Sequence, residues 1–153
     1  MHQSDLEMVP ATDDFLKEML ENPPLDAFIA EAARQTRAHQ THTGATCPWI
    51  GYFARRDGEW VGLCAFVEPP RDGAVEIAYG TAPAHQRRGI ATAMAGWLIA
   101  RAFAEKGIEA VVANTAPEFN ASTRILVRHG FVRDGVVQDH EIGEAWHWKK
   151  RRG

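Results

Sequence analysis

The segment that most constrains this chain is Gln86–Thr92, which reads Gln-Arg-Arg-Gly-Ile-Ala-Thr. It follows the apolar run 74–81, which is typical of a buried strand. It precedes an alanine-rich run with apolar residues at every fourth position, which is typical of a helix. Glycine at position 89 has no side chain to keep the backbone away from a ligand. Since the first N–H groups of a helix lack helical partners and favour an anion, the segment predicts a phosphate-binding loop.

The spacing of this loop differs from that of two familiar nucleotide-binding loops. It lacks the Gly-Lys-Ser/Thr ending of a P-loop and the three spaced glycines of a dinucleotide fingerprint, so a Rossmann-like domain is disfavoured. Backbone N–H groups are the expected phosphate ligands, and the two arginines are the expected charge partners. The candidate loop residues are Gln86, Arg87, Arg88, Gly89, Ile90, Ala91 and Thr92.

Length, charge and cysteine content restrict the class of protein. The 153 residues, 45% hydrophobic and 24% charged, suffice for a single domain over residues 1–153. A net charge of −3 gives no indication of nucleic-acid binding, and the basic run Lys149–Arg152 fits a solvated tail or a charge that attracts an anionic cofactor. No apolar run reaches membrane-spanning length, so we expect no membrane partner. Cys47 and Cys64 fit reduced thiols in a cytoplasmic protein.

Hydrophobic periodicity and turn residues predict a mixed α/β domain. Residues 1–12 are expected to be irregular. Helices are predicted at residues 12–22, 26–42, 90–106 and 122–129, and strands at 49–54, 60–67, 74–81, 109–114, 131–137 and 144–149. This order predicts a mixed sheet with helices on both faces, in which one parallel crossover carries the phosphate loop.

Three motifs along the chain resemble one protein family. The loop reads Gln-x-x-Gly-x-Ala, which resembles the coenzyme A pyrophosphate loop of the GNAT family of N-acetyltransferases. Residues 117–126, which read Pro-Glu-Phe-Asn-Ala-Ser-Thr-Arg-Ile-Leu, and the later Gly130-Phe131 resemble the branch that contains the ribosomal-protein alanine and serine acetyltransferases. The closing Trp146-His147-Trp148 resembles the end strand of small members of that branch. Together the motifs cover roughly residues 50 to 150.

This resemblance implies a fold and a reaction. The fold would be a mixed, mostly antiparallel sheet whose central strands, at 74–81 and 109–114, splay apart to admit the pantetheine arm. The reaction would move an acetyl group from acetyl-CoA to a primary amine by direct attack on the thioester. The acceptor would be a protein N-terminus or a small amine, and a homodimer is compatible with the resemblance. The rival hypothesis is a non-catalytic acyl-CoA-binding module that acts as a sensor or partner.

The resemblance also implies roles for residues around the loop. The backbone of Thr81 and Ala82 would pair with the pantetheine amides in a strand-like way. Asn114 would hold a pantetheine amide or a water, and Asn120 would cap the following helix or bind the pantetheine. No metal is expected, because the two histidines at 39 and 42 have no third ligand at a suitable spacing.

Two residues are candidates for catalysis. Glu76, a carboxylate in an apolar strand, is either a structural partner of an arginine such as Arg124 or a general base acting through water. Ser122, in the first turn of a helix, is either an N-cap residue or a hydrogen-bond donor to the departing sulfur. Many family members place a tyrosine soon after this serine, but Ile-Leu-Val stands at 125–127, which favours Ser122. Tyr79 is a remote substitute that we expect to pack in its strand.

Overall fold

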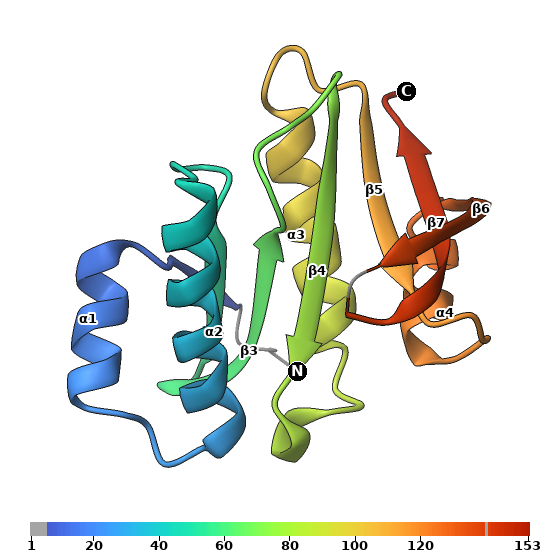
Figure 1. Ribbon diagram of the computed structural model, residues 1–153. Helices are drawn as coiled ribbons and strands as arrows, with labels where there is room; N and C mark the ends of the chain where they lie inside the picture. Colours follow the sequence, from blue (N-terminus) through green and yellow to red (C-terminus); the bar gives the residue numbers. More distant parts are fainter. Residues whose placement is uncertain (1–5, 140) are drawn as a thin grey trace.

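The computed structural model describes residues 6–139 and 141–153, which form one seven-stranded sheet with helices on both faces (Figure 1). The strand order is β1-β2-β3-β4-β5-β7-β6. The strands are β1 Glu7–Pro10, β2 Gly51–Arg56, β3 Glu59–Phe66, β4 Ala74–Thr81, β5 Ala110–Thr115, β6 Val132–Asp139 and β7 Gly143–Arg151. The helices are α1 Asp13–Glu21, α2 Ala27–Thr43, α3 Ile90–Phe103 and α4 Ala121–Arg128, with the 3-10 turn η1 Pro83–His85. The predicted fold class is confirmed.

The centre of the sheet holds its one parallel pair among the described strands, β4 with β5. The last residues joined across this pair are Glu76 and Val112, although both strands continue beyond them. We call this point the vertex of the splay. Beyond it, β4 stays paired only with β3, as far as Thr81, and β5 stays paired with β7, as far as Thr115. The two central strands therefore splay toward their carboxyl ends, as predicted, and the crossover between them runs through the loop and α3.

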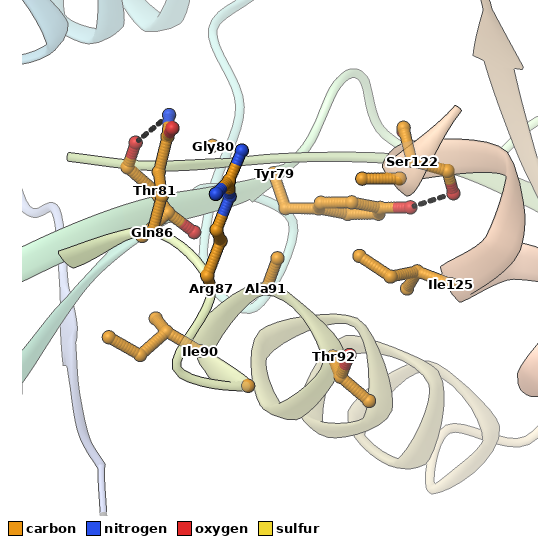
Figure 2. Close-up of a pocket in the computed structure, with 12 residues that line it drawn as sticks. Tyr79, Gly80, Thr81, Gln86, Arg87, Ile90, Ala91, Thr92, Ser122 and Ile125 are labelled. Carbon is orange, nitrogen blue, oxygen red and sulfur yellow. Dashed lines mark hydrogen bonds between the residues drawn. The ribbon is translucent and has the colours of Figure 1, made fainter. Parts of the chain in front are cut away.

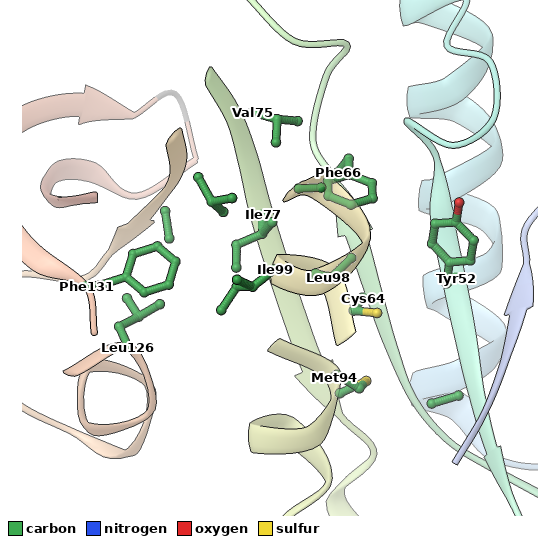
Figure 3. Close-up of a cluster of buried hydrophobic side chains, with 14 of the residues drawn as sticks. Tyr52, Cys64, Phe66, Val75, Ile77, Met94, Leu98, Ile99, Leu126 and Phe131 are labelled. Atoms are coloured by element: carbon green, nitrogen blue, oxygen red, sulfur yellow. The ribbon is translucent and has the colours of Figure 1, made fainter. Parts of the chain in front are cut away.

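The two faces of the sheet carry separate cores because successive strand residues point to opposite sides. On one face, Val75 and Ile77 of β4 pack in the same cluster as Leu98 of α3 and Leu126 of α4 (Figure 3). On the other face, α1 and α2 pack on Phe53 of β2. We refer to the first as the α3 face and to the second as the α2 face of the sheet.

The segment 1–12 contains the edge strand β1, so the prediction of an irregular segment is wrong for residues 7–10. β1 pairs antiparallel with β2 and places Glu7 opposite Arg55, with their side chains in an ion pair at 2.8 Å. A four-residue edge strand has too few positions to show an alternating pattern. It forms because β2 offers an edge for pairing. This partner is distant in sequence, since Glu7 and Arg55 are 48 residues apart.

The basic C-terminal run completes the sheet, so the prediction of a solvated tail is wrong. β7 extends to Arg151 and pairs with β5 over this length. The guanidinium of Arg152 then donates to the carbonyl oxygen of the last α3 residue, Phe103 (3.0 Å), and to those of Glu105 (2.9 Å) and Ile108 (2.7 Å) in the segment after α3. The last carbonyls of a helix lack helical partners. With this cap, α3 ends at Phe103 rather than near residue 106 as predicted.

We expect Arg152→Ala to lower the free energy of unfolding by about 1–2 kcal/mol. Hydrogen bonds from a charged group contribute ~1.5–3 kcal/mol when sheltered and less when exposed. For a chain of this size the change corresponds to ~2–8 °C in Tm, which calorimetry measures. Arg151→Ala is the matched control, since that side chain is exposed at the neighbouring position. Equal Tm values for the two variants would contradict the capping role.

Candidate active site

A cavity of about 470 Å³ opens where the splayed end of β4, the loop 86–92 and the first turns of α3 and α4 meet. Figure 2 shows the side chains that face it. Its walls are Tyr79, Gly80, Thr81, Gln86, Arg87, Gly89, Ile90, Ala91, Thr92, Ala121, Ser122 and Ile125. The fold therefore brings the predicted phosphate loop and the predicted catalytic serine to one site.

The loop presents its backbone to this cavity. Arg87 and Gly89 both adopt left-handed backbone conformations, with φ angles of 67° and 77°. Gly89 is the N-cap of α3, and among the described residues no side-chain hydrogen bond caps that end of the helix. A Cβ atom at Gly89 would meet no atom of residues 6–139 or 141–153 within 4 Å, so the space beside it in this part of the chain is open. Donors without helical partners thus face open space, which is the arrangement that binds anions.

Most of the residues predicted to bind the cofactor line this cavity together. They are Thr81, Gln86, Arg87, Gly89, Ile90, Ala91, Thr92 and Ser122. Ala82 and Arg88 belong to the same segment but do not line the cavity, since Ala82 is fully buried and Arg88 is exposed to solvent. The side-chain amide of Gln86 donates to the Thr81 carbonyl at 3.4 Å, which ties the loop to the end of β4.

Asn120, and not Ser122, caps α4. The Asn120 side chain accepts a hydrogen bond from the Thr123 N–H at 3.1 Å, and the Thr123 hydroxyl accepts one from the Asn120 N–H at 2.8 Å. This reciprocal pair is a capping box. The sequence predicted that Asn120 would either cap this helix or bind the pantetheine, and in the structure it caps the helix. Ser122 is the second residue of the helix and lines the cavity.

Tyr79 lies across the splay from Ser122. Its hydroxyl donates to the Ser122 carbonyl at 3.3 Å and so bridges β4 and the first turn of α4 (Figure 2). Burial raises the pKa of the Tyr79 hydroxyl, and the hydrogen bond with Ser122 opposes this. The phenol therefore keeps its proton at neutral pH and acts as a donor. Val127, in the segment where many relatives carry a tyrosine, is exposed and lies outside the cavity.

Glu76 lies at the vertex of the splay on the α2 face. It is three positions before Tyr79, so the two side chains point to opposite faces of the sheet. The half-buried Glu76 lines a smaller cavity of about 180 Å³ with Glu68, Pro69, Arg71, Ala74 and Val112. Ala78, two positions further on, is exposed on the same face. The sheet therefore stands between Glu76 and the cavity that contains Ser122.

A polar cluster that the sequence did not predict joins β5, β6 and β7. Nδ1 of His147 lies 2.8 Å from the side-chain oxygen of Asn114, and the Asn114 amide donates to the Asp139 carboxylate at 3.4 Å. Burial lowers the pKa of the His147 imidazole, and the positive charge of Lys149 lowers it further. The negative charge of Asp134 raises this pKa and so opposes both. Asn114, predicted to hold a pantetheine amide or a water, is engaged in this cluster.

The described residues provide little for metal or thiol chemistry. Among residues 6–139 and 141–153, no group of three His, Cys, Asp or Glu side chains is placed to hold a metal ion. Both Cys47 and Cys64 are free, and burial raises the pKa of the Cys64 thiol, which makes it a poor nucleophile. No helix within these residues is long and apolar enough to cross a membrane.

Comparison with known proteins identifies the family. The family model of the acetyltransferase (GNAT) domain matches residues 3–132, which is most of the chain. The chain therefore belongs to the GNAT family of acetyltransferases, as its motifs predicted. Family membership also confirms the predictions of an enzyme and of acetyl-CoA as its co-substrate.

Solved acetyltransferase structures share the fold over nearly the whole chain. RimL, a ribosomal alpha-N-protein acetyltransferase in complex with coenzyme A, has a TM-score of 0.70 at 15% identity, covering 95% of this chain and 93% of that one. The aminoglycoside acetyltransferase AAC(6')-Ib in complex with coenzyme A has 0.70 at 21%, covering 97% and 95%. A spermidine N-acetyltransferase SpeG chimera from Vibrio cholerae and hSSAT has 0.72 at 14%, covering 97% and 96%. A search of curated proteins finds no match.

Proposed function

We propose that this chain transfers an acetyl group from acetyl-CoA directly to a primary amine, either a protein N-terminus or a small amine. The observation that carries the proposal is the junction of three features at one cavity: the helix-start loop, the splayed edge of β4 and the Ser122 side chain. A loop alone would bind a phosphate. The splay adds a path for an extended arm, and Ser122 adds a hydroxyl where the reacting sulfur would arrive.

The cavity fits a phosphorylated ligand with an amide-containing arm. Beyond Glu76, β4 is paired with β3 but no longer with β5, so one edge of its backbone is free to pair with the amides of pantetheine. The Thr81 hydroxyl is buried and has no hydrogen-bond partner in the described chain, which leaves a donor for the ligand. The loop N–H groups and Arg87 would hold the pyrophosphate, and the exposed Arg88 adds charge.

The transfer has three chemical requirements. The amine must be uncharged to attack, the carbonyl must be polarised, and the departing thiolate must be stabilised. Acetyl-CoA is already an activated thioester, so positioning supplies much of the rate. Ser122 is the proposed donor to the departing sulfur. Direct transfer is favoured over an acyl-enzyme because neither Cys47 nor Cys64 lines the cavity, and burial makes Cys64 a poor nucleophile.

Glu76 is the proposed negative charge on the side of the sheet from which the amine approaches. It stands at the vertex of the splay on the α2 face. The cofactor cavity opens on the α3 face, so the α2 face is the side from which the acceptor would enter. A carboxylate there stabilises the positive charge that develops on nitrogen as the C–N bond forms. Its use as a general base through water, predicted from the sequence, stays a prediction.

We expect Glu76→Gln to lower kcat about tenfold while CoA affinity stays unchanged. One charge acting over ~10 Å at an effective dielectric constant of ~20 contributes ~1.7 kcal/mol, which is of this size. Steady-state kinetics and a CoA thermal shift give the two values. Glu109→Gln, at an exposed position, is the control. Normal turnover of Glu76→Gln would assign Glu76 a structural role only.

A non-catalytic acyl-CoA-binding module is the competing function. Release of free thiol from acetyl-CoA across a panel of N-terminal peptides, polyamines, aminoglycosides and amino acids separates the two. The proposal predicts release with at least one amine class, and binding of CoA without any release would favour the module. The same panel identifies the acceptor.

The two free cysteines support the predicted cytoplasmic location, and homodimer formation stays a prediction.

A further inference from the structure

The cluster of Asp139, Asn114 and His147 fixes the orientation of each member. Oδ1 of Asp139 accepts from the N–H groups of Glu141 (2.9 Å) and Ile142 (3.2 Å), which anchors this carboxylate at the β6–β7 turn. Its other oxygen, Oδ2, faces the Asn114 amide at 3.4 Å. Since a carboxylate only accepts, Asn114 must direct its NH₂ group toward Asp139.

This orientation determines which imidazole nitrogen of His147 carries the proton. With its NH₂ group on Asp139, Asn114 turns its oxygen toward His147, 2.8 Å from Nδ1. An amide oxygen only accepts, so Nδ1 must be the protonated nitrogen. In the neutral ring, Nε2 then carries the lone pair. Nε2 makes no hydrogen bond to any residue within 6–139 and 141–153.

The cluster lies beside the splay and on the acceptor side of the sheet. Val112 is paired with Glu76, and Asn114 is two positions further along β5, so both point to the α2 face. His147 is directly opposite Asn114 on β7 and shares that face. β7 lies one strand spacing, about 5 Å, from the β5 edge of the splay. The CoA cavity, with Tyr79, opens on the other face.

We propose that His147 is the proton acceptor for the amine, and that Asn114 is the positioning residue that sets its tautomer. The amine nitrogen attacks the thioester carbonyl carbon, and one N–H proton passes to Nε2 of His147. The C–S bond then breaks, its electron pair leaves on sulfur, and Ser122 hydrogen-bonds the thiolate. This inference rests on the proposed function, because it names the base for that reaction.

Burial keeps the His147 base neutral at physiological pH, against the negative charge around it. Asp134 and Asp139 of β6 and Glu76 of β4 contribute negative charge on its side of the sheet, and Lys149 of β7 contributes positive charge. Burial outweighs these charges and places the pKa of His147 below its usual value of 6.5. A group with a lowered pKa stays deprotonated to a lower pH. We therefore expect kcat to be constant near pH 7 and to fall only as the pH drops through this lowered pKa.

The test compares His147→Gln with His42→Gln. His42 is exposed at the end of α2, so its replacement controls for loss of a histidine. We expect His147→Gln to lower kcat about 100-fold, the lower range for general-base catalysis, and to remove the acid-side fall in the kcat–pH profile. CoA should still raise the Tm of both variants, which shows that His147→Gln is folded.

Asn114→Asp gives a readout that a structural role would not produce. A carboxylate in place of the amide stabilises the imidazolium and raises the pKa of His147. The acid-side fall in kcat should therefore move to higher pH, with kcat near pH 8 largely retained.

Either of two kcat–pH results would overturn the assignment of His147. One is a normal kcat–pH profile in His147→Gln. The other is loss of the acid-side fall in Glu76→Gln and not in His147→Gln, which would make Glu76 the base. If wild-type protein binds CoA but acetylates no amine in the panel, the proposed function fails and this inference fails with it. Activity in the wild type with unchanged His147→Gln would refute the inference alone.

Discussion

Gly89→Val should remove most of the stabilisation by CoA. Gly89 has a left-handed φ of 77° at the N-cap of α3, and a Cβ atom there would project into open space beside the loop. That space is the proposed phosphate site, so the valine side chain would hold the ligand away from the N–H groups. Losing two hydrogen bonds to a charged group, at ~1.5 kcal/mol each, weakens binding by about 100-fold.

Thermal shift with CoA measures this effect directly. At a ligand concentration ~100 times Kd, binding stabilises the native state by ~2.7 kcal/mol, or ~5–10 °C for a chain of this size. After a 100-fold loss of affinity the same concentration gives only ~0.4 kcal/mol, about 1 °C. Turnover at that acetyl-CoA concentration should fall in parallel.

Gly44→Val separates ligand exclusion from backbone strain. Gly44 caps the end of α2 with a φ of 66°, and a Cβ atom there would also meet no atom of the described residues within 4 Å, but it does not line the cavity. Valine at a left-handed position costs ~1–2 kcal/mol in either place. Both variants should therefore lose similar Tm without ligand, and only Gly89→Val should lose the CoA shift. A full shift in Gly89→Val would refute the loop assignment.

The fold and the loop could be predicted because their signals are local. Four-residue periodicity marked α3, and the glycine before it marked an uncapped helix start, where N–H groups have no other use. The splay followed from the family resemblance, and the pairing that ends at Glu76 confirms it. Ser122 could be predicted as a site residue because it belongs to a motif of consecutive residues. In the structure it lines the cavity.

The remaining features depend on pairing between distant segments. His147 and Asn114 lie 33 residues apart, and only the β5–β7 register places them opposite each other. Each residue alone has many structural uses, so no local pattern could identify the pair. The Arg152 cap on α3 has the same origin, since its carbonyl partners lie 44 to 49 residues away. The sequence predicts that Tyr79 packs in its strand, but β4 pairing sets the face on which its side chain lies and brings it to the cavity.

Ser122→Ala should slow acetyl transfer about 10- to 100-fold, with little change in CoA binding. A hydroxyl is a weak acid, so its role is to hydrogen-bond the developing thiolate rather than to transfer a full proton early. One hydrogen bond to a charged group contributes ~1.5–3 kcal/mol, which gives this range of rates. Because Asn120 and Thr123 cap α4 by themselves, the alanine variant should keep its Tm. A thioester with a more acidic leaving thiol should show a smaller loss.

Combining Ser122→Ala with Tyr79→Phe tests what the tyrosine adds. The Tyr79 hydroxyl donates to the Ser122 carbonyl, so it holds the helix turn that aims the serine side chain. If it acts through Ser122, the double variant should be about as slow as Ser122→Ala alone, since neighbouring effects of this kind are not additive. If Tyr79 donates to the sulfur itself, the losses should multiply. A loss beyond about a thousandfold from Ser122→Ala alone exceeds what one such bond supplies and would assign the serine a stronger role than thiolate stabilisation.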